Sequence, residues 1–166
     1  LNIEIISAPM SLEFLNFENF FTYDECISKS ESFEIMGFGG RIVTDGESIY
    51  FTIGWGGDFF KTTNEDSYFG KIFQINIQTK EEKILSKGHK NPQGLFYIEK
   101  INSLIFTEHG PISGDEINLL DLNSNGIKNY GWPYSTYGIH YVESLPDNLI
   151  DFDVNQKNHE DFGYVE

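Results

Sequence analysis

Several residue types and patterns that common functions require are scarce in this sequence. It has one cysteine, Cys26, and one arginine, Arg41. A lone cysteine excludes an internal disulfide and a Cys-x-x-Cys metal site, and a lone arginine excludes an arginine-lined phosphate site. No run of about 18 apolar residues suggests a membrane-spanning helix.

Positive charge is also scarce. Lys and Arg total 11 against 26 Asp and Glu, which gives the 166-residue chain a formal net charge of −15. Such a chain repels phosphate backbones and anionic lipid surfaces, so nucleic acid and membranes are poor candidate partners. Calcium or a neutral ligand suits this charge better.

Helical periodicity is nearly absent, and short β-rich runs recur between clusters of Gly, Asn, Asp and Ser. This pattern is typical of an all-β sandwich, barrel or propeller. Residues 24–36 are compatible with a short helix or a long loop. The predicted strands are 2–6, 12–22, 41–44, 48–53, 71–75, 82–85, 94–98, 103–107 and 116–121.

An internal repeat favours the propeller. Residues 48–52 read SIYFT and residues 103–107 read SLIFT, and each copy is followed by a Gly-rich loop that ends in an acid. Several strands per unit at a period of about 50 residues is the spacing of propeller blades. The blade-like units are about 1–36, 37–87 and 88–133, followed by an extended acidic and aromatic tail, 134–166.

Three blades are fewer than the four to eight of a closed ring. Because the chain also begins with Leu1 rather than Met, we expect it to be a fragment of a longer protein. Either further blades or a second copy of the chain, in a homodimer, would complete the propeller.

Three segments contain the densest groups of unusual residues: GHKNPQGL at 88–95, EHGPISGDEINL at 108–119 and NYGWP at 129–133. The second segment joins two predicted strands and exposes backbone carbonyls beside the carboxylates of Asp115 and Glu116. Carbonyl and carboxylate oxygens are the ligands that calcium prefers. The alternative is a tight loop whose Gly and Pro only set turn angles.

In order and spacing, these segments resemble the soluble pyrroloquinoline quinone (PQQ)-dependent sugar dehydrogenases, the glucose/sorbosone and aldose sugar dehydrogenases. The resemblance is strong over 88–133 and extends weakly back to about residue 37. It implies a six-bladed quinoprotein-type β-propeller, of which this chain covers about three blades. It also implies hydride transfer from a sugar or polyol hydroxyl to PQQ, with calcium, in a periplasmic or secreted protein.

The resemblance also implies roles for individual residues. Lys90, Asn91 and His109 would face the cofactor, with Lys90 where the family more often has arginine. The implied metal ligands are the carbonyls of Gly110 and Pro111 and, near a second, structural calcium, Glu116 and the carbonyl of Tyr130. His89 we interpret as a hydrogen-bonded structural residue.

One departure concerns catalysis. The family's general-base histidine corresponds to Gly37 here, with Met36 before it, and no histidine precedes His89. Trp55 and Phe60 stand where the family usually has polar residues. The sequence therefore predicts either a dehydrogenase without its catalytic base, or an inactive calcium-stabilised propeller that acts as a binding module, or an inactive fragment.

Overall fold

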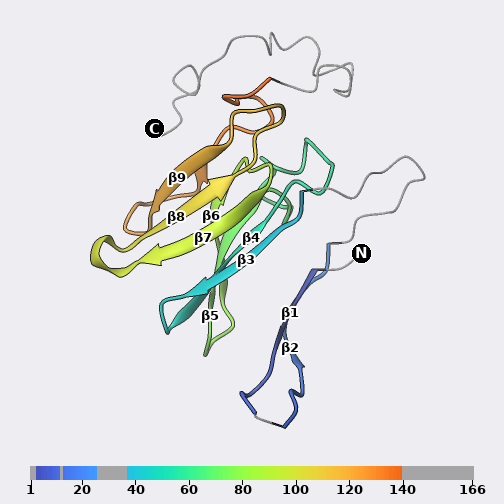
Figure 1. Ribbon diagram of the computed structural model, residues 1–166, viewed down its shortest axis with the longest axis vertical. Helices are drawn as coiled ribbons and strands as arrows, with labels where there is room; N and C mark the ends of the chain where they lie inside the picture. Colours follow the sequence, from blue (N-terminus) through green and yellow to red (C-terminus); the bar gives the residue numbers. More distant parts are fainter. Residues whose placement is uncertain (1–2, 12, 26–36, 140–166) are drawn as a thin grey trace, which may run out of the picture. The chain divides into compact units, whose positions relative to one another are not determined.

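The computed structural model describes residues 3–11, 13–25 and 37–139 (Figure 1). The described part consists of β-strands and loops, with one 3₁₀ turn, η1 (Glu99–Ile101), and no α-helix. In this part of the chain, no helix has the length and apolar character needed to cross a membrane. Most of the predicted helix or loop at 24–36 and most of the tail lie outside the described residues.

The N-terminal unit contains an antiparallel hairpin of β1 (Ile3–Ser7) and β2 (Glu18–Tyr23), with a register shift between Ile5 and Ile6. The predicted strand at 12–22 was wrong at its start, because β2 begins only at Glu18. The pairing ends at Ser7 and Glu18. Pro9 follows shortly after and has no N–H for a ladder hydrogen bond, which favours this early end.

The second unit contains two sheets. The first has the order β10-β6-β5-β4-β3. Strands β3 to β6 pair antiparallel, whereas the two-residue β10 pairs parallel with β6. The strands are β3 (Gly39–Thr44), β4 (Ser48–Ile53), β5 (Lys71–Asn76), β6 (Glu82–Lys87) and β10 (Lys128–Asn129).

The second sheet has the order β7-β8-β9, again antiparallel: β7 (Pro92–Ile98), β8 (Ser103–Glu108) and β9 (Glu116–Asp121). The two copies of the internal repeat form equivalent strands. SIYFT lies in β4, between β3 and β5, and SLIFT lies in β8, between β7 and β9.

The main core lies between the two sheets. Alternate side chains of a strand point to opposite faces, so each sheet contributes every second residue. Phe106 on β8 is 1% exposed in this core, whereas Phe96, on the neighbouring β7, is 64% exposed. The buried members are Tyr50, Ile72, Leu85, Leu104, Phe106, Leu120 and Tyr130.

The short strand β10, which was not predicted, determines where the chain goes after β9. It runs back to the edge of the first sheet instead of extending the second. There the Tyr130 N–H donates to the Lys87 carbonyl at 2.9 Å, and the Trp132 N–H donates to the Gly88 carbonyl at 3.0 Å. The segment NYGWP is thereby held against the segment GHKNPQGL.

The inter-sheet core makes a testable prediction. We expect Phe106→Ala to lower the free energy of unfolding by about 3–5 kcal/mol, because it leaves a cavity between the sheets. The matched control, Phe96→Ala on the exposed face, should change it by less than ~0.5 kcal/mol. Urea denaturation measures both, and equal losses would contradict the assignment of the core.

Candidate functional site

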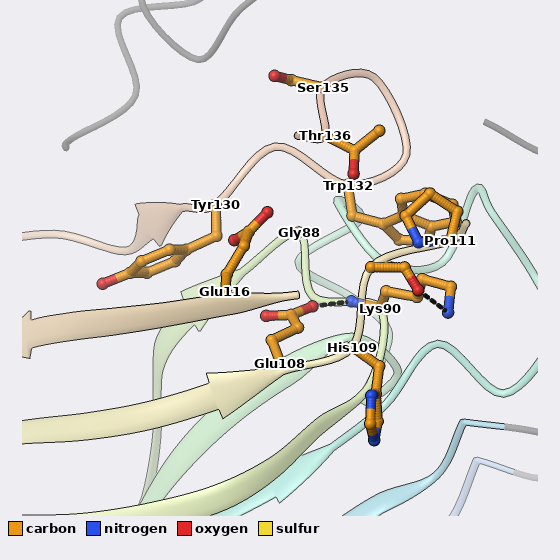
Figure 2. A pocket seen from close by; sticks show the side chains of 11 residues that line it. Gly88, Lys90, Glu108, His109, Pro111, Glu116, Tyr130, Trp132, Ser135 and Thr136 are labelled. Carbon is orange, nitrogen blue, oxygen red and sulfur yellow. Dashed lines mark hydrogen bonds between the residues drawn. The ribbon is translucent and has the colours of Figure 1, made fainter. Parts of the chain in front are cut away.

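The three unusual segments meet at one small pocket (Figure 2). Lys90 comes from the first segment, Glu108, Pro111 and Glu116 from the second, and Trp132 from the third. The pocket volume is about 10 Å³, on the order of one water molecule. It therefore has room for an ion or a water.

The carboxylate of Glu108 links two of these segments. It is 7% exposed, and its Oε1 accepts a hydrogen bond from the Lys90 backbone N–H. Its Oε2 lies 2.9 Å from Nδ1 of His89, whose Nε2 lies 2.8 Å from the Ser86 hydroxyl oxygen. His89 is thus a fully buried, hydrogen-bonded residue, as we interpreted it. Sequence reasoning assigned no role to Glu108, although it opens the second segment.

Lys90 is anchored at both its backbone and its side chain. Its carbonyl accepts a hydrogen bond from the Trp55 N–H at 2.8 Å. Its ammonium Nζ donates to the Gly110 carbonyl at 2.9 Å and lies 5.9 Å from the centre of a Trp132 ring. The residue is 8% exposed. A positive charge therefore sits on the carbonyl that the sequence analysis assigned to calcium.

Of the other two residues assigned to the cofactor, Asn91 is anchored to β3 and His109 is exposed. The Asn91 side-chain oxygen accepts a hydrogen bond from the Gly39 N–H at 3.1 Å, which ties the segment to β3. The His109 side chain is 52% exposed, with ring nitrogens 3.3 Å from Gln93 Oε1 and 3.4 Å from Asp115 Oδ2. In Figure 2 this ring points away from the other pocket residues.

The turn after Gly110 is unusually tight. The Gly110 N–H donates to the Asp115 carboxylate at 3.0 Å. A Cβ at Gly110 would lie 2.5 Å from the Gly114 carbonyl oxygen and would also overlap the Ser113 carbonyl oxygen. Only glycine fits where backbone oxygens approach so closely. This turn thus supplies the hard oxygen donors that calcium prefers.

Glu116 lies at the same pocket with a perturbed pKa. Burial, together with the negative charge of Glu108, raises the pKa of the Glu116 carboxyl to about 7, although hydrogen bonds from Asn118 and the Tyr137 backbone oppose the rise. A nearby cation would favour its charged form. Tyr130, assigned to the same metal, donates its hydroxyl to the Leu119 carbonyl at 2.8 Å, and burial raises its pKa.

No three His, Cys, Asp or Glu side chains gather as a metal site within the described residues. A metal here would therefore depend on backbone oxygens together with one or two carboxylates. Such mixed oxygen donor sets are common for calcium.

Gly37 lies beside Trp55 in a backbone conformation that favours glycine, with φ of 72°. A Cβ at this position would lie 2.6 Å from Cδ1 of the Trp55 ring and would also overlap the ring nitrogen. The Trp55 ring packs in turn against Phe59, at 4.9 Å between centroids, and edge-on against Trp132, at 6.0 Å. The indole therefore fills the space that a side chain at position 37 would need.

The loop that carries Trp55 and Phe59 is held by a residue that sequence reasoning missed. Lys71 is fully buried, and its Nζ donates to the carbonyls of Lys61, Thr62 and Phe69 at 2.9, 2.9 and 2.6 Å. Nothing in the sequence distinguishes this lysine from the solvent-exposed lysines. Its role depends on three carbonyls that only the folded loop brings together.

The family model for glucose/sorbosone dehydrogenase matches residues 15–157. The aldose sugar dehydrogenase YliI of Escherichia coli is 38% identical over 118 residues, which are 63% of this chain and 31% of that protein. The chain thus spans about a third of the length of this curated relative.

Solved structures agree. The apo-form soluble aldose sugar dehydrogenase from Escherichia coli matches with a TM-score of 0.66 and 29% identity, over 83% of this chain and 42% of that one. The PQQ-bound aldose sugar dehydrogenase from Streptomyces coelicolor matches with a TM-score of 0.60 and 26% identity, over 80% and 40%. These similarities confirm the predicted all-β propeller fold, of which the chain covers a part.

The raised pKa of Glu116 predicts a pH dependence of stability. Because the folded-state pKa of about 7 exceeds the ordinary 4.5, this group's contribution to stability is fully present below pH 4.5. It is lost as the pH rises through 7, by on the order of 2–3 kcal/mol. In chelator-treated protein, Glu116→Gln should therefore gain stability relative to wild type between pH 5 and 8.

Urea denaturation across this pH range measures the difference. Glu47→Gln, at an exposed turn, is the control and should follow the wild-type profile. A constant difference between Glu116→Gln and wild type at all pH values would contradict the shifted pKa.

The contact between Gly37 and Trp55 predicts a steric cost. Gly126 has a similar φ of 76°, with nothing within 4 Å of an added Cβ. Gly126→Ala should therefore cost only the backbone strain, about 1–2 kcal/mol. Gly37→Ala should cost a further ~1–3 kcal/mol from overlap with the indole. In a Trp55→Ala background this extra cost should vanish. Urea denaturation measures it, and an equal cost of Gly37→Ala in wild type and in Trp55→Ala would contradict the overlap.

Proposed function

This chain belongs to the glucose/sorbosone dehydrogenase family, and we propose that its site binds PQQ together with calcium and serves the oxidation of a sugar or polyol hydroxyl. The supporting observation is that the segments 88–95, 108–119 and 129–133 converge on one pocket lined by carbonyl, carboxylate and ammonium groups. Since the chain spans about a third of the aldose sugar dehydrogenase YliI, the proposal concerns its contribution to that activity.

The pocket fits calcium in both size and donor chemistry. Its volume is that of an ion, and the Lys90 ammonium on the Gly110 carbonyl indicates that a cation is favourable there. The carbonyls of Gly110 and Pro111 would hold the ion. Glu116, with the carbonyl of Tyr130, would hold a second, structural calcium.

PQQ, when bound, supplies a quinone that accepts a hydride from the substrate carbon, and calcium acts as a Lewis acid towards it. The chain's own contribution would come from Lys90, Asn91 and His109. Lys90 offers a point charge to an anionic group, without the planar fork of an arginine. Asn91, anchored to Gly39, would keep this segment in place.

A second candidate function is an inactive, calcium-stabilised binding module. It is favoured by Gly37, which offers no side chain to remove the hydroxyl proton, and by Trp55, whose ring fills the space a base would need. A positioned general base contributes typically about 10²–10⁴-fold to rate. In this candidate calcium would raise the melting temperature while no sugar is oxidised.

By the same family relationship we propose a periplasmic or secreted location. A propeller completed by further blades, or by a second copy of the chain, would enclose the site. Sedimentation velocity distinguishes a monomer from a compact dimer.

The two functions are separated by one experiment on the chelator-treated chain. Titration with PQQ and calcium is followed by quinone absorbance, and reduction of a redox dye is then measured with a panel of aldoses and polyols. We expect quinone binding that depends on calcium. Dye reduction that requires both PQQ and calcium supports the dehydrogenase, whereas calcium binding without dye reduction supports the module. Absence of quinone binding at any calcium concentration would refute the dehydrogenase, and a melting temperature that calcium does not raise would refute the module.

A further inference from the structure

The ammonium of Lys90 contacts a carbonyl that the proposed function assigns to calcium. Its Nζ donates to the Gly110 carbonyl at 2.9 Å, inside a pocket with room for about one ion (Figure 2). The face of Trp132 lies on another side of the charge, at 5.9 Å. We propose that Lys90 is the resident cation of this carbonyl, and that a divalent ion binds there only when the ammonium moves away. This inference rests on the calcium site of the proposed function.

The Lys90 ammonium and a calcium ion exclude each other from the Gly110 carbonyl, because of distance and charge. Calcium binds carbonyl oxygens at about 2.3–2.6 Å, closer than the 2.9 Å at which the ammonium lies from the same oxygen. A cation in this pocket would therefore stand within a few ångströms of the ammonium. Like charges so close in a shielded site repel strongly, because little solvent screens them. Calcium and the ammonium thus compete for the Gly110 carbonyl.

Release of the Gly110 carbonyl would require only the side chain of Lys90 to move. The Lys90 backbone is held at both ends of the residue, by its N–H on Glu108 and by its carbonyl on the Trp55 N–H. The flexible four-carbon side chain can therefore swing while the main chain stays in place. A ligand that carries a carboxylate would attract the ammonium and free the carbonyl.

Linkage then makes the binding of the two ligands mutually dependent. An anion that draws Lys90 away raises the affinity for calcium, and calcium must raise the affinity for that anion by the same factor. The site would thus load an anionic cofactor and its metal together, and hold either one weakly alone.

Isothermal titration calorimetry of calcium into chelator-treated protein tests this, with Lys90→Met as the variant. Removing the competing ammonium should lower the dissociation constant for calcium by about 10-fold without any anion. Lys87→Met is the matched control. It removes the same charge at a position three residues before Lys90, where the lysine forms a surface ion pair with Glu65. It should leave calcium affinity nearly unchanged. Equal affinities for the two variants would overturn the inference.

A second measurement compares calcium binding with and without PQQ. Saturating PQQ, which carries carboxylates, should tighten calcium binding to the wild-type chain, and this tightening should be smaller in Lys90→Met. If wild type binds calcium equally tightly with and without PQQ, the inference fails while the calcium site survives. If neither wild type nor Lys90→Met binds calcium, both this inference and the metal part of the proposed function fail.

Discussion

The buried carboxylate of Glu108 is the group on which the architecture of the site depends. One oxygen accepts the Lys90 N–H and the other meets the His89 ring, so the end of β8 is joined to the loop that leaves β6. A buried carboxylate without partners is costly, and this cost keeps the two segments together. The positions of Lys90 and of the turn at Gly110 follow from this junction.

Close backbone approach is the second constraint. At Gly110 an added Cβ would overlap neighbouring carbonyls, and at Gly37 it would overlap the Trp55 ring. The lack of a side chain has a different effect on the structure at each of these two glycines. The first lets backbone oxygens crowd into a hard-donor turn, whereas the second leaves a space that an aromatic side chain has filled. The turn at Gly110 thus offers backbone oxygens, whereas the space beside Gly37 is filled by the Trp55 ring.

Two lysines donate hydrogen bonds from their ammonium groups to backbone carbonyls. Lys71 satisfies three carbonyls of the loop that bears Trp55 and Phe59, and Lys90 satisfies the carbonyl of Gly110. An ammonium can stabilise such oxygen clusters without a metal ion, because it brings both charge and three donors. Lys71 lies fully buried, whereas Lys90 lies at a pocket, and the proposed exchange with another cation therefore concerns Lys90.

The sequence by itself determined the all-β class, most strands from β3 to β9, and the repeat that places SIYFT and SLIFT in equivalent strands. These features depend on alternation and on Gly and Asn at turns, which are local properties of the chain. The family motifs also predicted roles for Lys90 at the cofactor, for Gly110 at its calcium and for Glu116 near a second calcium. Tertiary structure alone decided that β10 returns to the first sheet, that Trp55 covers Gly37, and that the Lys90 ammonium rests on Gly110. Each of these is a contact between residues distant in sequence, and its energy comes from burial and charge that exist only once the sheets have packed.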